Sequence, residues 1–314
     1  MTHLYADPVF QGHETPPGHP EAPERARAVS AALVECPQVT SRHLSLDPSA
    51  ETNAALELVH DPGYIAAIEA AAASGGKALD SDTFVSPASY EIARRATATL
   101  LGATRASLAA EAEDSARQAF VVVRPPGHHA RPARGMGFCL FNHVAVAAAD
   151  ARRAGLERVT VLDFDVHHGN GTQEMFWSQA GVQYVSIHGK GYYPGTGAED
   201  ETGEGDGLGT TLNVPLPSDT SPEDYQLAFA SAMRRVSKFN PELLLVSAGF
   251  DAYVEDPVGG LGLAPEHFHW IGAELRAVAE ACCGGRLVSV LEGGYDIGAL
   301  GGLAQAYVEG QASA

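Results

Sequence analysis

Asp163, Asp165 and His167 alternate at the end of an apolar run, in the stretch Val-Thr-Val-Leu-Asp-Phe-Asp-Val-His-His-Gly at residues 159–169. The run predicts a buried strand over residues 159–164. Because strand side chains alternate between two faces, the three polar side chains should project from one side. Two carboxylates and an imidazole are costly to bury unless they bind a metal or pair with each other. The stretch therefore predicts such a cluster at the carboxyl end of a parallel strand, where ligands bind in α/β sheets.

Polar side chains also follow three other predicted strands. They occur in Arg-Pro-Pro-Gly-His-His (residues 124–129), Ser-Ala-Gly-Phe-Asp (residues 247–251) and Glu-Gly-Gly-Tyr (residues 292–295). Loops at one edge of a parallel sheet converge, so we expect Asp251 beside Asp165 and His167. One nitrogen and two oxygen ligands leave room for water and substrate, as a catalytic zinc site requires. This pattern is more specific than a lone histidine at a strand end, which is usually structural.

The tandem histidines His128 and His129 fit a paired general base and acid beside such a metal. The alternative is that one of them is a core histidine bonded to the backbone. Asp163 could orient one of the imidazoles. Tyr295 follows two glycines and could donate a hydrogen bond to a developing oxyanion, whereas the simpler interpretation of a tyrosine is packing. These residues are candidates for acid–base chemistry beside the metal.

The rest of the chain alternates apolar strands with amphipathic helices. Strands are expected at residues 56–60, 119–123, 159–164, 182–187, 243–247 and 287–291. Helices are expected at residues 24–34, 62–73, 87–113, 141–154, 171–179, 222–239, 265–283 and 297–307, with loops at residues 11–23 and 74–85. Near-continuous apolar strands predict a mostly parallel central sheet covered by helices on both faces, a three-layer α/β/α fold. Without a repeat or a linker-like segment, residues 1–314 are expected to form a single domain.

The composition, with 45% apolar and 19% charged residues, is typical of a globular enzyme. The net charge is 20 − 39 = −19 and no basic stripe occurs, which argues against direct nucleic-acid binding. Solubility is the simpler explanation of the acidic surface, although it could also attract a cationic substrate. No apolar run approaches about 18 residues and the N-terminus does not resemble a signal peptide, so we expect no membrane association and a cytoplasmic location. The four cysteines are expected to be reduced and buried.

Taken in order, these motifs resemble those of the histone deacetylase family, within the arginase–deacetylase fold. The resemblance spans nearly the whole chain and runs through residues 12–25, 124–130, 137–142, 162–171, 186–197, 213–217, 247–260 and 291–296. Leu-Glu-Gly-Gly-Tyr, Asp-Pro-Val-Gly-Gly and Asn170 look most like the class II deacetylases and their bacterial relatives, which include acetylpolyamine amidohydrolases. The resemblance implies a single deacetylase-like catalytic domain that hydrolyses linear amides with the help of a metal.

The resemblance also implies two ion sites. Asp165, His167 and Asp251 match the zinc ligands of the family, and ferrous iron suits the same donor set. The family additionally holds a structural potassium ion through oxygen ligands, which suit a hard monovalent ion. The residues that fit this second site are Asp163, Asp165, His167, Ser186 and Ile187, with His167 and Ile187 contributing backbone carbonyls.

For catalysis, the resemblance implies that His129 is the likelier general base and that His128 acts mainly through its charge. Asp163 matches the carboxylate that orients His128, and Tyr295 matches the tyrosine that stabilises the oxyanion. Asn170 falls where some relatives place an aspartate beside the second histidine. A neutral amide should raise the basicity of that imidazole less than a carboxylate would.

The substrate is expected to enter a narrow tunnel, as in the family. Phe138 and Tyr193 match its aromatic walls, and Gly137 matches the backbone that approaches the substrate; core packing is the alternative for both aromatic residues. Val258 lies where polyamine-selective relatives can carry a glutamate, so it argues against a dedicated charged-amine selector. Asp82 matches, more loosely, an acidic residue at the rim that holds the substrate backbone.

The function implied is zinc-dependent hydrolysis of an N-acetyl or N-acyl amine, foremost acetyl-lysine in a protein or peptide. The alternative substrate is an acetylpolyamine or another small N-acyl amide. An arginase-like enzyme with two manganese ions would need an aspartate where Gly169 stands. A non-catalytic binder of acylated ligands would not need the complete set of catalytic residues.

The acyl length and the oligomeric state depend on loops. The acyl length depends on the tunnel floor, which the loops around Arg25, Gly137 and Gly294 could alter. An oligomer is possible, and the loops at residues 16–23 and 74–87 are candidates for a tunnel rim or an interface.

Overall fold

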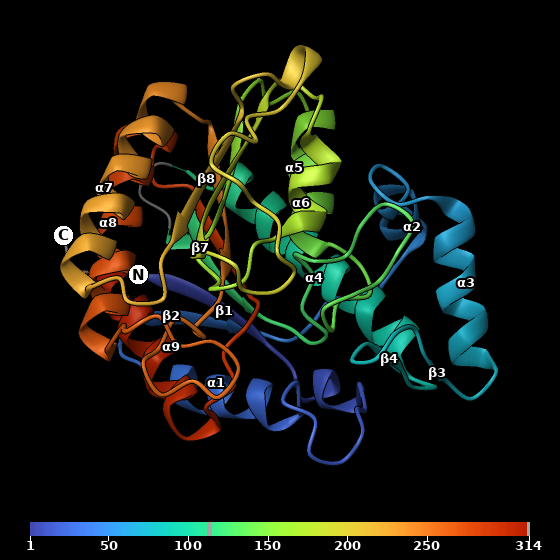
Figure 1. Cartoon of the computed structure of the whole chain (residues 1–314). Coiled ribbons are helices and arrows are strands. Elements are labelled where there is room, and N and C mark those ends of the chain that lie inside the picture. The colour runs from blue at the N-terminus through green and yellow to red at the C-terminus, as the bar shows by residue number, and fades with distance from the viewer. Residues whose placement is uncertain (112–114, 313–314) are drawn as a thin grey trace.

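An eight-stranded sheet with only parallel pairings forms the centre of the computed structural model, which describes residues 1–111 and 115–312 (Figure 1). Its strand order is β2-β1-β5-β10-β9-β6-β7-β8. The strands are β1 (Thr2–Ala6), β2 (Val39–His43), β5 (Gln118–Val122), β6 (Val159–Asp163), β7 (Val182–Gly189), β8 (Thr211–Leu216), β9 (Leu243–Ala248) and β10 (Leu287–Leu291). A separate antiparallel hairpin joins β3 (Lys77–Ala78) and β4 (Phe84–Val85).

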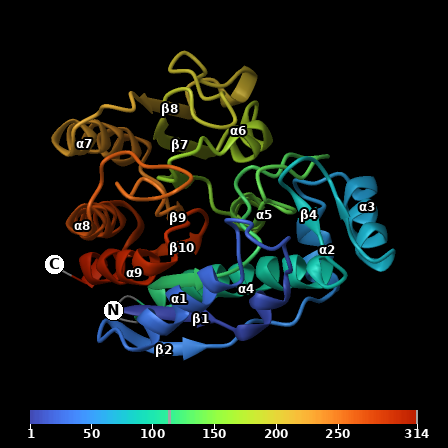
Figure 2. The same cartoon turned by 60° about the horizontal axis from the view of Figure 1, so that its bottom comes forward.

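Helices cover both faces of this sheet (Figures 1 and 2). The helices on one face are α1 (Glu24–Val34), α7 (Pro222–Phe239), α8 (Pro265–Cys283) and α9 (Ile297–Ala312). Those on the other are α4 (Ser89–Ala109), α5 (His143–Arg153) and α6 (Asn170–Phe176). Beyond them, α2 (Ala50–Leu56), α3 (Pro62–Ala73) and the hairpin pack at one end of the molecule around a third, smaller core. The predicted three-layer α/β/α fold is confirmed.

The central strands show why the sheet was readable from the sequence. In β9, Leu244 and Val246 belong to the core beneath α7 and α8, whereas Leu243 and Leu245 belong to the core beneath α4 and α5. All four side chains are fully buried. A strand buried on both faces has no polar side, so its sequence is a continuous apolar run.

Most predicted elements are confirmed, several of them with the same bounds, namely α1, α3, α7, α8 and β10. Capping side chains mark some of these ends: Asp61 accepts hydrogen bonds from the first amides of α3, and Ser221 caps α7. The helix expected at residues 87–113 ends at Ala109 within the described part of the chain; residues 112 and 113 lie outside the described residues.

The strand expected at residues 56–60 is wrong, because this stretch ends helix α2 and continues as a turn. Ser49 and Thr52 form a capping box that starts the helix, a local signal that the short apolar run concealed. The loop expected at residues 74–85 contains the short hairpin of β3 and β4, and strands β1, β2 and β8 of the central sheet were not expected either. β2 and β8 lie at the two edges of the sheet, where one side is exposed and polar residues are tolerated, so their sequences lack a clear apolar pattern.

The topology decides where the site lies. The strands β5, β10, β9 and β6 are consecutive neighbours at the middle of the sheet. Because they are parallel, the four loops that follow them emerge at the same edge, and these loops carry the polar residues singled out in the sequence. Within the described residues, none of the helices is both long and apolar enough to span a bilayer.

Candidate active site

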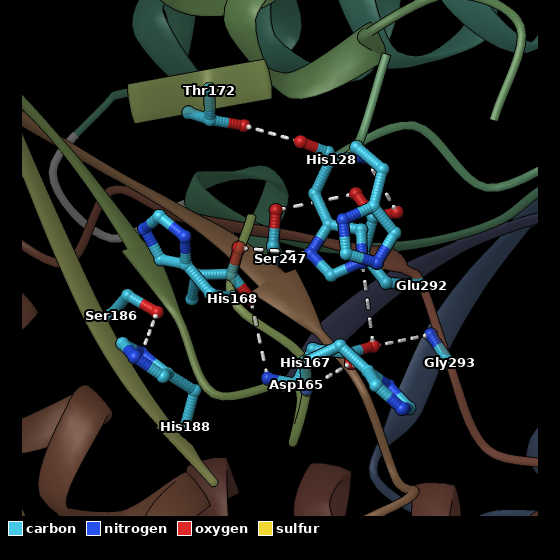
Figure 3. Close-up of polar contacts among 12 residues, drawn as sticks. His128, Asp165, His167, His168, Thr172, Ser186, His188, Ser247, Glu292 and Gly293 are labelled. Carbon is cyan, nitrogen blue, oxygen red and sulfur yellow. Dashed lines mark hydrogen bonds and ion pairs between the residues drawn. The ribbon is translucent and has the colours of Figure 1, made fainter. Parts of the chain in front are cut away.

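Two carboxylates and one imidazole meet beyond the ends of β6 and β9. The Nδ1 atom of His167 lies 2.9 Å from Oδ2 of Asp251 and 3.2 Å from Oδ1 of Asp165. One ligand atom from each of the three residues lies within 4.8 Å of the others, and all three are buried. Figure 3 shows Asp165 and His167 close to His128, Glu292 and Gly293. The structure thus brings together the predicted metal ligands as a candidate metal site.

The charges at this point suit a divalent cation. Burial and the neighbouring Asp165 carboxylate raise the pKa of Asp251 to about 7. Burial also disfavours a charged His167, but its hydrogen bonds to the two carboxylates outweigh that effect and raise its pKa to about 10. Two buried carboxylates therefore concentrate negative charge beside His167, and Nε2 of His128 lies 3.9 Å from Oδ2 of Asp165 as a second counter-charge. A donor set of two oxygens and one nitrogen fits zinc or ferrous iron.

Glycines let the backbone close around this cluster. A Cβ atom at Gly293 would collide with the carboxylates of both Asp165 and Asp251, and one at Gly249 would collide with Asp165. The amide of Gly293 donates a hydrogen bond to Oδ2 of Asp165 at 2.7 Å. The glycines after β9 and β10 are therefore required by the close approach of the two loops to the ligands.

The imidazole of His128 is held by the carboxylate of Asp163. Its Nδ1 donates to Oδ2 of Asp163 at 3.0 Å, and the hydroxyl of Tyr184 donates to the same oxygen at 3.1 Å. Burial alone would lower the pKa of His128, but the charges of Asp163 and Asp165 raise it to about 10. The structure therefore gives His128 the partner that was expected for it, and favours its charged form.

His129 is the neutral member of the pair. Burial and the positive charges of His128 and His167 hold its pKa well below the ordinary value of 6.5. Its Nδ1 lies 2.9 Å from Oδ1 of Asn170, whose amide nitrogen contacts the sulfur of Met136 at 3.5 Å. An amide oxygen can only accept, so Nδ1 carries the proton and Nε2 keeps a free lone pair.

Tyr295, in the loop after β10, packs against two side chains. The guanidinium of Arg25 lies 4.7 Å from the centre of its ring, and the ring centres of Tyr295 and Phe138 lie 5.8 Å apart in an edge-to-face arrangement. Arg25 also donates to the carbonyl oxygen of Gly294 at 2.6 Å, where a φ of 113° requires glycine. Burial raises the pKa of Tyr295 well above its usual range. Its hydroxyl therefore stays protonated and can donate.

A cavity of about 420 Å³ leads to these groups. Its lining consists of Asp82, His129, Gly137, Phe138, His167, Tyr192, Tyr193, Val258, Gly259 and Tyr295. All five predicted tunnel and rim residues are among them. Tyr193 and Val258 are 40% and 37% exposed, which places them toward the mouth. A Cβ atom at Gly137 would collide with the ring of His129 and press on Tyr193, so glycine keeps this wall thin.

The residues expected to hold potassium lie on neighbouring strands. Asp163 on β6 is the register partner of Ser186 on β7, and Ile187 follows directly. The hydroxyl of Ser186 lies 2.8 Å from Nδ1 of His188. The structure therefore brings Asp163 and Ser186 together on neighbouring strands, and the potassium site stays a prediction.

Sequence reasoning missed the buried carboxylate of Glu292. It accepts hydrogen bonds from the amides of Gly127 and His128 at 2.7 and 3.1 Å, and from the hydroxyl of Ser247 at 3.2 Å. Burial, the largest influence, raises its pKa to about 7. Glu292 thereby ties the histidine loop to the ends of β9 and β10. An acidic residue directly after the fully buried strand β10, whose only polar residue is Ser289, is the signal that could have found it.

A second buried network of ion pairs joins Glu21 to Arg25 and Arg124. Glu21 accepts from Nη1 of Arg25 at 3.1 Å and from Nη2 of Arg124 at 2.7 Å, and all three side chains are fully buried. The charges of Arg124, together with its hydrogen bonds, overcome the effect of burial and lower the pKa of Glu21 to about 2. This paired cluster anchors the Pro-rich segment before α1 to the strand ends beside the cavity.

Comparison with known proteins places these features in context. A sequence profile described as the histone deacetylase domain matches residues 19–311. The chain is 41% identical to a histone deacetylase-like amidohydrolase of Pseudomonas aeruginosa, over 88% of this chain and 73% of that protein. It is 38% identical to a probable deacetylase of Archaeoglobus fulgidus, over 91% of this chain and 79% of that protein. It is 36% identical to histone deacetylase 15 of Arabidopsis thaliana over 93% of this chain, but spans only 52% of that protein.

Solved structures agree with the sequence comparison. The crystal structure of the HDA15 HD domain superposes with a TM-score of 0.86 at 33% identity, covering 98% of this chain and 87% of that one. An acetylpolyamine aminohydrolase from Burkholderia pseudomallei superposes with a TM-score of 0.83 at 28% identity, covering 100% of this chain and 99% of that one.

Proposed function

The chain belongs to the histone deacetylase family, whose members hydrolyse amides, and from this premise we propose that it is a zinc-dependent deacylase acting on N-acetyl-lysine in a peptide or protein. One observation carries the proposal. The candidate metal ligand His167, the neutral imidazole of His129 and the hydroxyl-bearing Tyr295 all line the same narrow cavity. Residues 1–314 would form one catalytic domain.

Asp165, His167 and Asp251 would hold the zinc ion, and ferrous iron would fit the same ligands. A divalent cation bound there supplies a Lewis acid that polarises the amide carbonyl and makes water more acidic. A potassium ion would lie next to it, held by oxygen atoms of Asp163, Asp165, His167, Ser186 and Ile187. Such an ion would offset part of the negative charge of the buried carboxylates.

The two histidines would divide the proton chemistry. His129 has a free Nε2 lone pair and would take the proton from the water whose oxygen attacks the acyl carbon. The same proton would then go to the amide nitrogen as the carbon–nitrogen bond breaks, which gives an amine and a carboxylic acid; the acid then releases the remaining water proton to the solvent and becomes a carboxylate. His128, held by Asp163, would contribute a fixed positive charge.

Tyr295 would donate a hydrogen bond to the oxygen that becomes negative during the attack. Arg25 and Phe138 contact its ring and hold it in place, and Tyr295 lines the cavity. A donor held in place before the reaction needs no reorganisation when the charge develops.

The cavity favours acetyl-lysine as substrate. Its aromatic walls suit the methylene chain of a lysine, and Val258 provides no charge that would select a second amine. Asp82 lies at the lining and would accept a hydrogen bond from the substrate backbone. An acetylpolyamine is the alternative, because one of the similar structures is that of an acetylpolyamine aminohydrolase.

A second manganese ion, as in an arginase-like enzyme, is not favoured. A Cβ atom at Gly169 would collide with the carboxylate of Asp163 and the hydroxyl of Tyr184. An aspartate at this position would therefore need rearrangement of the group that orients His128.

The test is hydrolysis of a substrate panel by the purified chain, with and without a chelator. The panel comprises an acetyl-lysine peptide, acetylputrescine and acetylspermidine. We expect chelator-sensitive release of acetate, restored by zinc, with the peptide preferred. Preference for the acetylpolyamines would replace the substrate assignment, and no metal-dependent turnover of any acyl amide would refute the proposed activity.

A further inference from the structure

One buried carboxylate links the wall of the tunnel to the backbone of Tyr295. Oδ1 of Asp256 accepts hydrogen bonds from the amides of Val258 and Gly259 at 2.9 and 3.0 Å. Its Oδ2 accepts from the amides of Tyr295 and Asp296 at 2.6 and 3.2 Å. The side chain of Asp256 is 9% exposed, so these four amides are its main partners.

The two segments come from different parts of the chain. Val258 and Gly259 belong to the loop after β9, and both line the cavity. Tyr295 follows β10 and lines the same cavity. The residues just before Tyr295 are fixed by other contacts: Arg25 donates to the carbonyl oxygen of Gly294, and Gly293 donates to Asp165 and accepts from the amide of Phe250. At Tyr295 itself, Asp256 ties the backbone amide to the wall that the substrate contacts.

We propose that Asp256 is a positioning residue that couples the Val258–Gly259 wall of the tunnel to the placement of Tyr295. This inference rests on the proposed function of Tyr295 as the hydrogen-bond donor to the oxyanion. Charge-assisted hydrogen bonds from four amides make the link stiff, since a carboxylate bonds to amides more strongly than a neutral acceptor does. A substrate that displaces the wall displaces the donor as well.

Asparagine at this position is the sharpest probe. It keeps the shape of the side chain but replaces one oxygen by an NH₂ group, which cannot accept a hydrogen bond. Two of the four amides in Asp256→Asn then face a donor, and one of the two segments is released. Asp61→Asn is the matched control, because Asp61 also accepts from two amides, those of Gly63 and Tyr64, but at the start of α3.

The first measurement is hydrogen exchange, which is independent of catalysis. In the unmodified protein, the amides of residues 258–259 and 295–296 should show similar protection. In Asp256→Asn, at least one of these two segments should exchange roughly tenfold faster, because it has lost one charge-assisted hydrogen bond. Asp61→Asn should leave the exchange rates of both segments unchanged. If, in the unmodified protein, the amides of residues 258–259 exchange freely while those of residues 295–296 are fully protected, the two segments are not linked and the proposal fails.

The second measurement is a double-mutant cycle with Tyr295→Phe. If Asp256 acts through Tyr295, Asp256→Asn should lower kcat roughly tenfold or more, but less than about threefold when Tyr295 is already phenylalanine. An equal loss in both backgrounds means general damage and refutes the coupling, as does an unchanged kcat. If the unmodified protein hydrolyses no acyl amide, the proposed function fails, while the exchange data still decide whether Asp256 links the two segments.

Discussion

The side-chain oxygen of Asn170 accepts a hydrogen bond from Nδ1 of His129 at 2.9 Å. This neutral partner does not outweigh burial and the positive charges of His128 and His167, which lower the pKa of His129 and keep it neutral. The equivalent contact of the neighbouring His128 is made to a carboxylate, that of Asp163. The two adjacent imidazoles therefore differ in charge because one has an amide partner and the other an acidic partner. A positive His128 further disfavours a positive His129, which keeps the second ring available as a base.

Replacing Asn170 by aspartate should make His129 more basic. A carboxylate within hydrogen-bond distance favours the charged imidazole, so the pKa of His129 rises. Because the base must be unprotonated, the acidic limb of the pH profile of kcat/KM should move to higher pH by roughly one unit. Asn240→Asp, at the exposed end of α7, is the control for a remote added charge. An unshifted profile in Asn170→Asp would refute His129 as the base.

Removing the hydroxyl of Tyr295 should affect turnover without affecting metal binding. Tyr295→Phe should lower kcat by roughly 10²–10³ if the hydroxyl stabilises the oxyanion. Tyr225→Phe is a suitable control, because the buried hydroxyl of Tyr225 has no hydrogen-bond partner within the described structure. Steady-state kinetics and zinc content are measured for both variants. A near-normal kcat in Tyr295→Phe would exclude the role.

The chain should be more stable with a divalent cation than without it. A ligand that binds only the folded state stabilises it by about 2.7 kcal/mol at a concentration 100 times its Kd. Thermal unfolding in a zinc titration should show this increase for the unmodified protein and for Asp206→Asn, which changes an exposed acid. Asp251→Ala should lose it. Equal zinc-induced shifts in both variants would place the ion elsewhere.

Glu292 should matter for its acceptor atoms more than for its charge. Gln at this position can present its oxygen to the amides of Gly127 and His128 and its nitrogen to the hydroxyl of Ser247. Glu292→Gln should therefore remain folded and close to normal stability. Glu292→Leu leaves two buried amides without acceptors and should cost on the order of 2–4 kcal/mol in the free energy of unfolding. Chemical denaturation of both variants checks this, and equal stability of the two would contradict it.

Buried neutral histidines should make the protein sensitive to acid. Burial lowers the pKa of His60 and of His143 from 6.5 to about 4. Between these values the unfolded chain binds protons that the folded chain does not, so the free energy of unfolding falls as the pH falls from 6.5 toward 4. Each of these two imidazoles should lower the free energy of unfolding by about 2 kcal/mol at pH 5.

Denaturation curves between pH 7.5 and 5 measure this effect. Nε2 of His60 accepts from the amide of Asn142, so His60→Gln removes a titrating group and should flatten the dependence on pH, whatever its effect on stability at pH 7.5. The same slope in the variant and the unmodified protein would show that His60 is not responsible.

The structure also shows how local signals limited the prediction of elements. Helices with a capping residue or an N-terminal proline, such as α3, α7 and α8, were predicted with the bounds that the structure has. The edge strands β2 and β8 were missed, because their side chains are only partly covered and their order in the sheet depends on residues far away in the chain. β1 was also missed. It lies between β2 and β5, so its place in the sheet likewise depends on residues far away in the chain.

Local patterns along the chain were enough to predict the parallel sheet and the types of residue at its edge. Strands such as β9 are apolar on both faces, and a strand that runs into Asp163, Asp165 and His167 has a period of two that orients these side chains together. These are local properties, and neighbouring residues suffice to create them.

The contacts between distant groups depend on how the folded chain packs. The capture of the His128 amide by Glu292 and the link from Asp256 to Tyr295 both join loops that follow different strands, and neither was predicted, whereas the meeting of Asp251 with His167 was expected from the convergence of parallel strand ends. Their distances depend on the order of the strands and on packing across the sheet. Since a hydrogen bond requires contact within about 3 Å, no pattern along the chain could supply that information.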